Sequence, residues 1–511
     1  MEKEIAVSFR GVTKTFAGEV IANKNVNLDV YKGEILSLLG ENGSGKTTLM
    51  NMLAGIYYPD EGHISIYGKE VVIKSPRDAF EHGIGMVHQH FKLIDVLTAT
   101  ENIILGLPGK LNIKEAQGKI KEICDKYGFD VDPNKKIYDM SVSEKQTIEI
   151  VKVLYRGADI LILDEPTAVL TPQETEKLFS VMRNMKLDGK SIIIITHKLH
   201  EVEAISDRVA VLRKGQFIGE LITENTNAQE MTDMMVGRTV MLNIERKDPV
   251  NPSPRITVEG LTIKDNEGVY KLKDVSFTAY SGEILGIAGI SGCGQKELLE
   301  AIAGLQTIEA GNIWYTTDGK NATNLIGMDP RSIKDLGIAL SFVPEDRLGM
   351  GLVANMDLSD NMMLRSYRDG DSKLFTDRKS PKELAGNIVD ELEVVTPSVE
   401  TPVRRLSGGN VQKVLVGREI ASAPAVLMTA YAVRGLDINS SYTIYELINE
   451  QKEKGTAVIF VGEDLDVMLQ LCDKILVLCG GEVSGIVDGR KADKNELGLL
   501  MTKKGGETNG K

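Results

Sequence analysis

Residues 40–47 have the composition of a loop that binds phosphate. The segment GENGSGKT fits the pattern G-x-x-x-x-G-K-[ST]. Glycines let the backbone wind tightly around an anion, and the positive end of a following helix adds to the attraction. Lys46 is expected to reach the β- and γ-phosphates of a nucleotide, and Thr47 to bind Mg²⁺. The predicted phosphate contacts are Gly40, Glu41, Asn42, Gly43, Ser44, Gly45, Lys46, Thr47 and Thr48.

Polar residues that suit hydrolysis end short apolar segments in the first half of the chain. ILILDEPT contains Asp164, whose carboxylate is suited to contact Mg²⁺. It also contains Glu165, whose carboxylate is suited to act as a base that polarises the attacking water. A carboxylate pair that caps a helix is the alternative interpretation. His197, after SIIIIT, is a candidate to orient the γ-phosphate or a structural residue, and Gln89 is a candidate bridge to metal and water. The predicted catalytic residues are Lys46, Gln89, Glu165 and His197, and the predicted metal contacts are Thr47, Gln89 and Asp164.

The elements that must position these residues alternate between strands and helices. Short apolar segments ended by polar residues are typical of buried parallel strands, whereas longer segments with apolar residues at helical spacing predict helices. Strands are predicted over 33–40, 158–166 and 191–197, and helices over 46–54 and 171–185. The sequence therefore predicts an α/β fold on a mostly parallel sheet, with a helical insertion over 95–156. Phe16 is a candidate to stack on adenine, with a core position as the alternative.

The chain repeats itself at a long period. Residues 26–55 match 275–304, and two later pairs match with a larger offset, so the second copy carries an insertion. The later pairs are 140–150 with 406–416 and 207–221 with 473–487. The expected organisation is a first domain over 1–240, a proline-containing linker over 241–254, a second domain over 255–500 and a flexible tail over 501–511.

The composition narrows the classes of partner. The chain has 511 residues and a net charge of −13, from 60 Lys and Arg against 73 Asp and Glu, so no nucleic-acid partner is expected. No apolar run approaches the ~20 residues that span a bilayer, so a role at a membrane must act through partners. The four cysteines are far apart and indicate neither a zinc site nor a disulfide framework.

The segment LSGGN at 406–410 resembles the signature of ATP-binding cassette (ABC) proteins. Together with the phosphate loop and the residues after the predicted strands, it identifies the chain as a member of that family. Two fused cassettes with a defective second one resemble the ATPase subunit of bacterial sugar and nucleoside importers. Residues 85–106 and 234–238 are most similar to the nucleoside-import branch.

This resemblance implies a fold, a ligand and partners. Each copy is expected to contain a RecA-like core, an antiparallel β subdomain and a helical subdomain. Two cassettes face head to tail in the family, with ATP and Mg²⁺ between the phosphate loop of one and the signature of the other. Two transmembrane permease subunits are expected in grooves near 90–107 and 346–364, at the cytoplasmic face of the membrane. An extracellular substrate-binding protein is implied as an indirect partner.

The two phosphate loops are not equivalent. Gln295 and Lys296 replace Lys46 and Thr47 in the second copy, although its glycines remain. The other replacements are Ala430 for Asp164, Tyr431 for Glu165, Glu463 for His197 and Glu345 for Gln89. Carboxylates at 345 and 463 would repel a γ-phosphate. The second copy is therefore not expected to hydrolyse ATP with its own residues.

The signature segments differ in the opposite sense. Ser407, Gly408 and Gly409 open a predicted helix at Asn410, and the four are predicted to contact the nucleotide. In the first copy, residues 141–144 read Ser-Val-Ser-Glu, and the carboxylate of Glu144 competes with an anion. Head-to-tail pairing joins the intact loop to the intact signature, which predicts one competent ATPase site and one degenerate site. Neutral drift at a helix start is the alternative.

Three alternatives to nucleoside import remain open. The first is the same role in uptake of a simple sugar of the ribose, galactose or xylose type. The second is a soluble twin-cassette translation factor, which the short linker and the single intact site disfavour. The third is a scaffold that binds ATP without turnover, which Asp164, Glu165 and His197 disfavour.

Overall fold

The chain divides into two compact units, Met1–Met241 and Leu242–Lys511. The computed structural model describes residues 4–16, 20–89, 91–107, 112–168, 170–237, 244–265, 267–290, 292–317, 321–335, 338, 340–367 and 377–502. Some parts of the sequence predictions lie outside this set: residues 503–511 of the tail, residues 241–243 of the linker, Arg238 at the end of the segment 234–238 and His90 at the start of the first groove. Each unit is described by itself.

The first unit contains a six-stranded and a four-stranded sheet. The strand order of the larger sheet is β10-β9-β3-β8-β7-β6, and all neighbours are parallel except β9 and β10. Its strands are β3 (Ile35–Leu39), β6 (Ile84–Val87), β7 (Ile160–Asp164), β8 (Ser191–Ile195), β9 (Arg208–Arg213) and β10 (Gln216–Ile222). The smaller sheet is antiparallel with the order β2-β1-β4-β5, from β1 (Ile5–Phe16), β2 (Val20–Tyr31), β4 (Glu61–Ile66) and β5 (Lys69–Val71).

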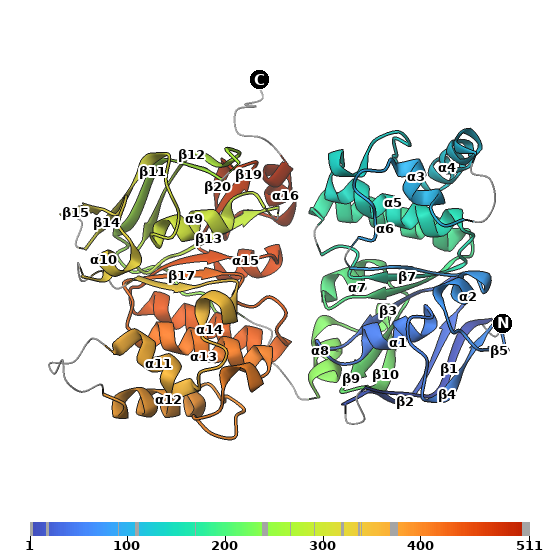
Figure 1. Ribbon diagram of the computed structural model, residues 1–511, viewed down its shortest axis with the longest axis horizontal. Coiled ribbons are helices and arrows are strands. Elements are labelled where there is room, and N and C mark those ends of the chain that lie inside the picture. Colours follow the sequence, from blue (N-terminus) through green and yellow to red (C-terminus); the bar gives the residue numbers. More distant parts are fainter. Residues whose placement is uncertain are drawn as a thin grey trace. The chain divides into compact units, whose positions relative to one another are not determined.

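Helices cover both faces of the larger sheet, as Figure 1 shows for α1 on one side and α5 and α6 on the other. They are α1 (Lys46–Leu53), α2 (Pro76–Glu81), α3 (Ala99–Ile104), α4 (Ile113–Tyr127), α5 (Val142–Tyr155), α6 (Pro172–Leu187), α7 (Leu199–Ile205) and α8 (Ala228–Val236). Alternate residues of a strand point to opposite faces, so Ile160 and Ile162 of β7 pack toward α1 and the small sheet while Leu161 and Leu163 pack toward α5 and α6. This two-sided burial explains why the strand sequences are continuously apolar.

The second unit repeats this architecture. Its larger sheet has the order β16-β17-β18-β13-β19-β20, and its smaller antiparallel sheet has the order β12-β11-β14-β15. The strands are β11 (Pro254–Lys264), β12 (Tyr270–Tyr280), β13 (Ile284–Gly289), β14 (Ala310–Thr316), β15 (Ala322–Asn324), β16 (Leu340–Val343), β17 (Val426–Ala430), β18 (Ala457–Val461), β19 (Lys474–Cys479) and β20 (Glu482–Asp488). The helices are α9 (Gln295–Ile302), α10 (Pro330–Asp335), α11 (Leu358–Ser366), α12 (Lys379–Glu391), α13 (Gly408–Ala421), α14 (Ile438–Glu453), α15 (Leu465–Leu471) and α16 (Lys494–Thr502).

Most predicted elements agree with the structure. The helical insertion expected over 95–156 contains α3, α4, a short 3₁₀ turn and α5, and no strand occurs among its described residues. The fold is α/β with one parallel core and one antiparallel sheet in each unit. Within the part of the chain that the structure describes, no helix has the length and apolarity needed to cross a membrane.

Part of the expected linker packs against the second unit. Ile244 joins the largest core cluster of that unit, and Arg246 donates a hydrogen bond to the carbonyl oxygen of Cys472. The ammonium of Lys452 donates to the carbonyl oxygen of Lys247 at 2.6 Å. These contacts fix residues 244–247 to the second unit.

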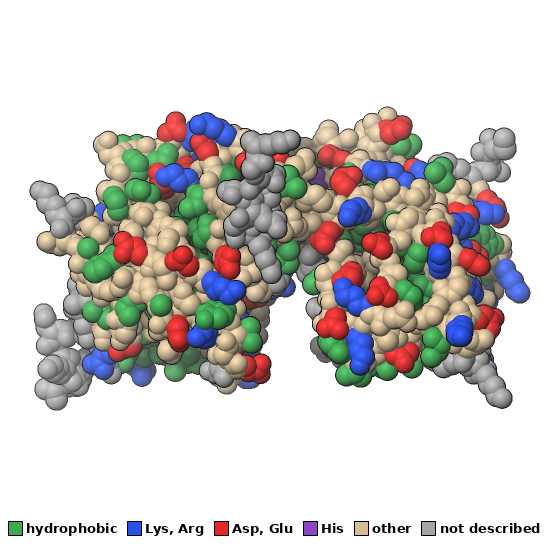
Figure 2. Space-filling view, turned by 90° about the horizontal axis from the view of Figure 1, so that it is seen from above, with side chains coloured by type: hydrophobic (Ala, Val, Ile, Leu, Met, Phe, Trp, Pro, Cys, Tyr) green, Lys and Arg blue, Asp and Glu red, His purple; other side chains and the backbone are tan. Residues whose placement is uncertain are grey.

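Charged side chains of both signs are interspersed over each unit on the face drawn in Figure 2. This mixture agrees with the moderately negative net charge of −13. Acidic and basic side chains pair locally, as in Lys190 with Asp159 at 2.7 Å and Lys382 with Glu400 at 2.8 Å.

In each unit, a buried asparagine binds the backbone of the loop before its own helix, α3 or α11. These matching contacts provide a test of the repeat. Asn102 donates to the carbonyl oxygen of Ile94 at 3.0 Å and accepts from its N–H at 2.7 Å. Asn361 makes the corresponding contacts to Val353, at 3.2 and 2.8 Å. Asn361→Ala should therefore destabilise the second unit by about 2 kcal/mol, because buried backbone groups lose their partners.

Asn102→Ala should do the same to the first unit. Urea denaturation followed by hydrogen exchange on peptides of each unit measures the two effects separately. Equal stability of wild type and both variants would contradict the structural role of these side chains.

Candidate active site

The phosphate loop connects β3 to α1 and is shaped by backbone packing. Gly45 has a φ of +95°, and a Cβ built there would lie 2.3 Å from the carbonyl oxygen of Ala22. A Cβ on Gly40 would lie 2.2 Å from the carbonyl oxygen of Leu212 and 2.4 Å from Oγ of Ser44. No side chain fits at either position, so these glycines create the concave loop that the sequence predicts.

Lys46 lies inside this loop. Its side chain is buried, with 7% of the residue exposed, and Nζ donates to the carbonyl oxygens of Gly40 and Glu41 at 2.6 and 3.0 Å. Burial lowers the pKa of Lys46 to about 8, although Glu165 and Asp164 favour the charged form. The loop thus holds a partly desolvated cation where a phosphate oxygen can replace the carbonyl oxygens.

Glu165 joins the ends of three neighbouring strands. Gln89, after β6, donates from Nε2 to Oε2 of Glu165 at 3.0 Å, and Nδ1 of His197, after β8, lies 2.9 Å from Oε1. Glu165 follows β7 with a φ of +46°, and its N–H donates to the carbonyl oxygen of Ile195 at 2.9 Å. Burial raises the pKa of Glu165, but the bond with His197 and the charge of Lys46 outweigh it, so the net pKa is lowered. The structure therefore brings three predicted catalytic residues together around an ionised carboxylate.

Asp164 lies beside Thr47 at the end of β7. Burial and the neighbouring Glu165 raise the pKa of Asp164 to about 6, while Lys46 and a hydrogen bond with the Thr47 side chain oppose the rise. A hydroxyl and a carboxylate fit Mg²⁺, which binds one or two carboxylates together with phosphate oxygens. Among the described residues, no group of three or more His, Cys, Asp or Glu side chains could hold a metal ion alone. The donors present thus suit a metal that arrives with a nucleotide.

Phe16 lies half-buried at the end of β1. Its ring makes an edge-on contact with Tyr57, with 5.1 Å between centroids, and Nζ of Lys14 lies 5.7 Å from its centroid. Tyr57 is exposed and was not predicted, because it follows α1 without a recognisable motif. The pair presents aromatic surface beside the small sheet, and stacking on adenine stays a prediction.

The second loop keeps the backbone shape of the first. Gly294 has a φ of +101°, like Gly45, and Gln295 is buried with 2% exposed. Nε2 of Gln295 donates to the carbonyl oxygen of Ile290 at 3.2 Å, which corresponds to the contact of Lys46 with Glu41. A neutral amide therefore supports the loop in place of the ammonium.

The residues beside the second loop form a salt-bridge cluster that the sequence analysis missed. Arg434 donates from Nη1 to Oε1 of Glu345 at 2.6 Å, and its Nε lies 3.2 Å from Oε1 of Glu463. Its guanidinium also lies 5.9 Å from the ring centroid of Tyr431, which has the same left-handed backbone as Glu165. Arg434 pairs with both of these carboxylates, so one positive charge faces two negative charges, and repulsion of a phosphate by this cluster stays a prediction.

The signature segment of the second unit is open at its helix start. Ser407 caps α13, and its Oγ accepts from the side-chain amide of Asn410 at 3.0 Å and from its N–H at 3.4 Å. Ser407 and Gly408 are exposed. A Cβ on Gly409 would lie 2.9 Å from Oγ of Ser440 and 3.2 Å from Oδ2 of Asp437, so this glycine packs against the start of α14.

The corresponding helix start in the first unit is closed. Ser141 and Glu144 form a reciprocal capping box at the start of α5. The carboxylate of Glu144 accepts from the N–H of Ser141 at 2.7 Å and pairs with Nζ of Lys135 at 2.7 Å. The positive end of α5 is therefore already occupied by an acidic side chain.

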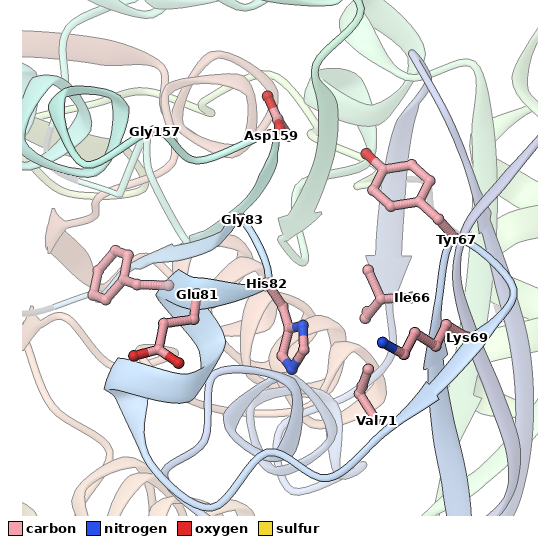
Figure 3. Close-up of a pocket in the computed structure, with 10 residues that line it drawn as sticks. Ile66, Tyr67, Lys69, Val71, Glu81, His82, Gly83, Gly157 and Asp159 are labelled. Atoms are coloured by element: carbon pink, nitrogen blue, oxygen red, sulfur yellow. The ribbon is translucent and has the colours of Figure 1, made fainter.

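A surface pocket of about 420 Å³ lies in the first unit between the β4–β5 hairpin and the end of α2. Figure 3 shows the side chains of Lys69 and His82 pointing toward one another across it. The predicted site residues do not line this pocket; its lining residues are Ile66, Tyr67, Lys69, Val71, Phe80, Glu81, His82, Gly83, Gly157 and Asp159.

Comparisons with known proteins find a matching family model and relatives that cover the chain. Residues 23–168 and 272–429 match a family model described as ABC transporter. The chain is 42% identical, over 99% of its length, to the whole guanosine import ATP-binding protein NupO of Bacillus subtilis. It is also 42% identical, over its whole length, to the whole nucleoside import ATP-binding protein NupA of Lactococcus lactis subsp. cremoris. Identity is 39% to the glucose import ATP-binding protein TsgD13 of Haloferax volcanii, over 99% of this chain and 98% of that protein.

A solved structure of the archaeal ribosome recycling factor aABCE1, in complex with the ribosomal stalk protein aP1, is also similar. The match has a TM-score of 0.59 and covers 91% of this chain and 87% of that chain. At 17% sequence identity it shows the fold alone.

The pKa values of Asp164 and Lys46 predict how nucleotide binding depends on pH. Binding of ATP with Mg²⁺ needs an ionised Asp164 and a charged Lys46, so affinity should be highest between about pH 6 and about pH 8. It should fall below this range as Asp164 gains a proton and above it as Lys46 loses one. Equilibrium binding to the nucleotide-free chain measures this profile, and Asp164→Asn, which removes the acid limb, corrects for titration of ATP itself. A profile of wild type that matches Asp164→Asn at acidic pH would contradict the prediction.

Proposed function

The chain belongs to the ABC transporter family and is an import ATPase. From that premise, we propose that ATP hydrolysis at one composite site drives uptake of nucleosides. The observation that carries the proposal is the cluster of Gln89, Glu165 and His197 in the first unit. The second unit has Glu345 and Glu463 around Arg434 instead. One unit therefore holds a base for water, and the other does not.

The proposed chemistry assigns each residue of the first unit a role. Lys46 exchanges its loop carbonyls for the β- and γ-phosphate oxygens of ATP. Glu165 polarises the attacking water, while Gln89 and His197 orient its carboxylate. Mg²⁺, when bound through Thr47 and Asp164, neutralises charge on the phosphate oxygens.

Ser407, Gly408, Gly409 and Asn410 are proposed to complete this site from the second unit. The start of α13 offers a serine hydroxyl and the positive end of a 14-residue helix to an anion. The start of α5 does not, because Glu144 occupies it. Head-to-tail pairing of the cassettes brings the open helix start to the intact loop.

The proposed membrane partners are two permease subunits that bind different surfaces of this chain. The proposed location of the chain is the cytoplasmic face of the membrane. An extracellular substrate-binding protein is proposed as an indirect partner. Support comes from exposed apolar side chains in both expected grooves. They are Ile94, Val96 and Leu105 in the first, and Leu348, Met350, Val353, Met356 and Leu364 in the second. The groove segment of the second unit is also longer than that of the first. Gln89 and Asn102 are 13 positions apart, whereas the matching Glu345 and Asn361 are 16 positions apart. The extra residues lie in a π-helical turn, Arg347–Gly351, so the two surfaces differ in shape.

Nucleosides are the proposed solutes because the two relatives with 42% identity over their whole length are named for guanosine and nucleoside import. A simple sugar is the second candidate, since a glucose import protein is 39% identical. Uptake of labelled guanosine by cells that carry the complete transporter, with competition by unlabelled nucleosides or sugars, distinguishes them. Competition by a simple sugar alone would contradict nucleoside import.

Substitution in the two loops tests the single-site proposal. Lys46→Ala and Glu165→Gln should each lower phosphate release by about 100-fold or more, because they remove transition-state charge stabilisation and the base. Gln295→Ala, at the position that matches Lys46, should leave the rate within about twofold of wild type. The measurement is steady-state phosphate release by the full chain with its permease. If Gln295→Ala lowers turnover as much as Lys46→Ala does, the two sites are not unequal.

A further inference from the structure

The signature segment of the second unit is held by uncharged groups, through bonds of Ser407 with Asn410 and of Asn410 with Val395. In the first unit, Glu144 forms a capping box with Ser141 and an ion pair with Lys135 at the helix start. In the second unit, Asn410 replaces Glu144, and two glycines precede it. Glycines contribute no side-chain contacts and leave the backbone free to move. Beyond the Ser407 cap, residues 408 and 409 therefore depend on neighbouring elements for a defined position.

Arg347 provides one such neighbour. It lies at the start of the π-helical turn that follows β16, and a Cβ built on Gly408 would lie 3.3 Å from its Nη1. Its Nη2 donates a hydrogen bond to the carbonyl oxygen of Arg434. The guanidinium of Arg347 thus lies between the backbone of the signature segment and the loop after β17.

Arg434 connects that loop to two further strand ends. Its guanidinium pairs with Glu345, two residues before Arg347, and with Glu463 after β18. Glu345, Arg434 and Glu463 thus link the ends of β16, β17 and β18, as Gln89, Glu165 and His197 link the ends of β6, β7 and β8. The central charge is inverted, from a carboxylate to a guanidinium. This connection is made by side chains of the second unit.

We propose that Arg347 and Arg434 are positioning residues for the signature segment 407–409, held in place by Glu345 and Glu463. The inference rests on the proposed function, in which this segment completes the competent site. The side chains that replaced the catalytic residues of the second copy then serve hydrolysis at the other site. Phe91 and Ala168 occupy the matching positions in the first copy, so the device is specific to the second unit.

The ion pairs of Arg434 with Glu345 and Glu463 are exposed, so an effect on the position of the signature segment can be told apart from an effect on the stability of the unit. The side chains of Arg434, Glu345 and Glu463 are 52%, 35% and 46% exposed. Ion pairs as exposed as these contribute little to folding. Loss of the pairs should therefore change the geometry of the segment without unfolding the unit.

The test compares Arg434→Gln, Arg347→Gln and the double variant in the full chain with its permease. Each single variant should lower kcat for phosphate release about 10-fold or more through misplacement of the segment, with the Kd for ATP and the thermal unfolding midpoint unchanged. The double variant should be no slower than the slower single variant, because both act through one connection. Arg434→Lys should recover only part of the rate, since an ammonium lacks the planar fork. Arg490→Gln, which removes a surface ion pair with Asp248 in the same unit, is the matched control and should match wild type.

The variants distinguish failure of the positioning role from failure of the composite site. A normal kcat in Arg434→Gln, a midpoint that falls with kcat, or multiplicative effects in the double variant would overturn the positioning role. Ser407→Ala tests the proposed function separately, because it removes the hydroxyl and leaves both arginines in place. If Ser407→Ala has a normal kcat while Lys46→Ala is inactive, the composite site itself is wrong. If Ser407→Ala is slow and Arg434→Gln is normal, only the positioning role is wrong.

Discussion

In the first unit, the ends of three parallel strands are tied together at one carboxylate, and the predicted site depends on this constraint. Glu165 meets this constraint through Gln89 and His197, at 3.0 and 2.9 Å. Parallel strands end at the same edge of a sheet, so residues separated by 76 and 32 positions meet there. The left-handed backbone of Glu165, with a φ of +46°, turns its carboxylate to that edge. A strained backbone of this kind persists only where the surrounding sheet imposes it.

The second unit keeps the constraint and changes the chemistry. Tyr431 has the backbone of Glu165 and the same hydrogen bond to the neighbouring strand, from its N–H to the carbonyl oxygen of Val461 at 3.0 Å. Burial and the carboxylates of Glu463 and Glu345 raise the pKa of Tyr431 to about 12, so it stays a neutral phenol. The two units therefore share one scaffold and carry different side chains at the same strand ends. In the second unit, Arg434 supplies the connection between the strand ends.

Much of this site was predictable from sequence, and the reason is local. The glycine loop and the polar residues after apolar strands are contiguous patterns, so Lys46, Asp164 and Glu165 could be identified without coordinates. The capping box of Ser141 and Glu144 is a local pattern too.

The missed contacts depend on distant partners. Arg434 meets Glu345, which lies 89 positions earlier, and no motif marks that pair. Only the folded sheet edge shows that Glu345 and Glu463 share one guanidinium. The packing of Arg246 against Cys472 was missed for the same reason, since the two lie 226 positions apart.

A single active site built from both halves of the chain is tested most directly by a structure of the Glu165→Gln variant in the complete transporter with ATP and Mg²⁺. We expect the γ-phosphate that contacts Lys46 to lie within about 3 Å of Oγ of Ser407, as a hydrogen bond requires. A γ-phosphate beside Lys46 that faces Ser141 of the same cassette, with Ser407 in solvent, would show that the site is not composite.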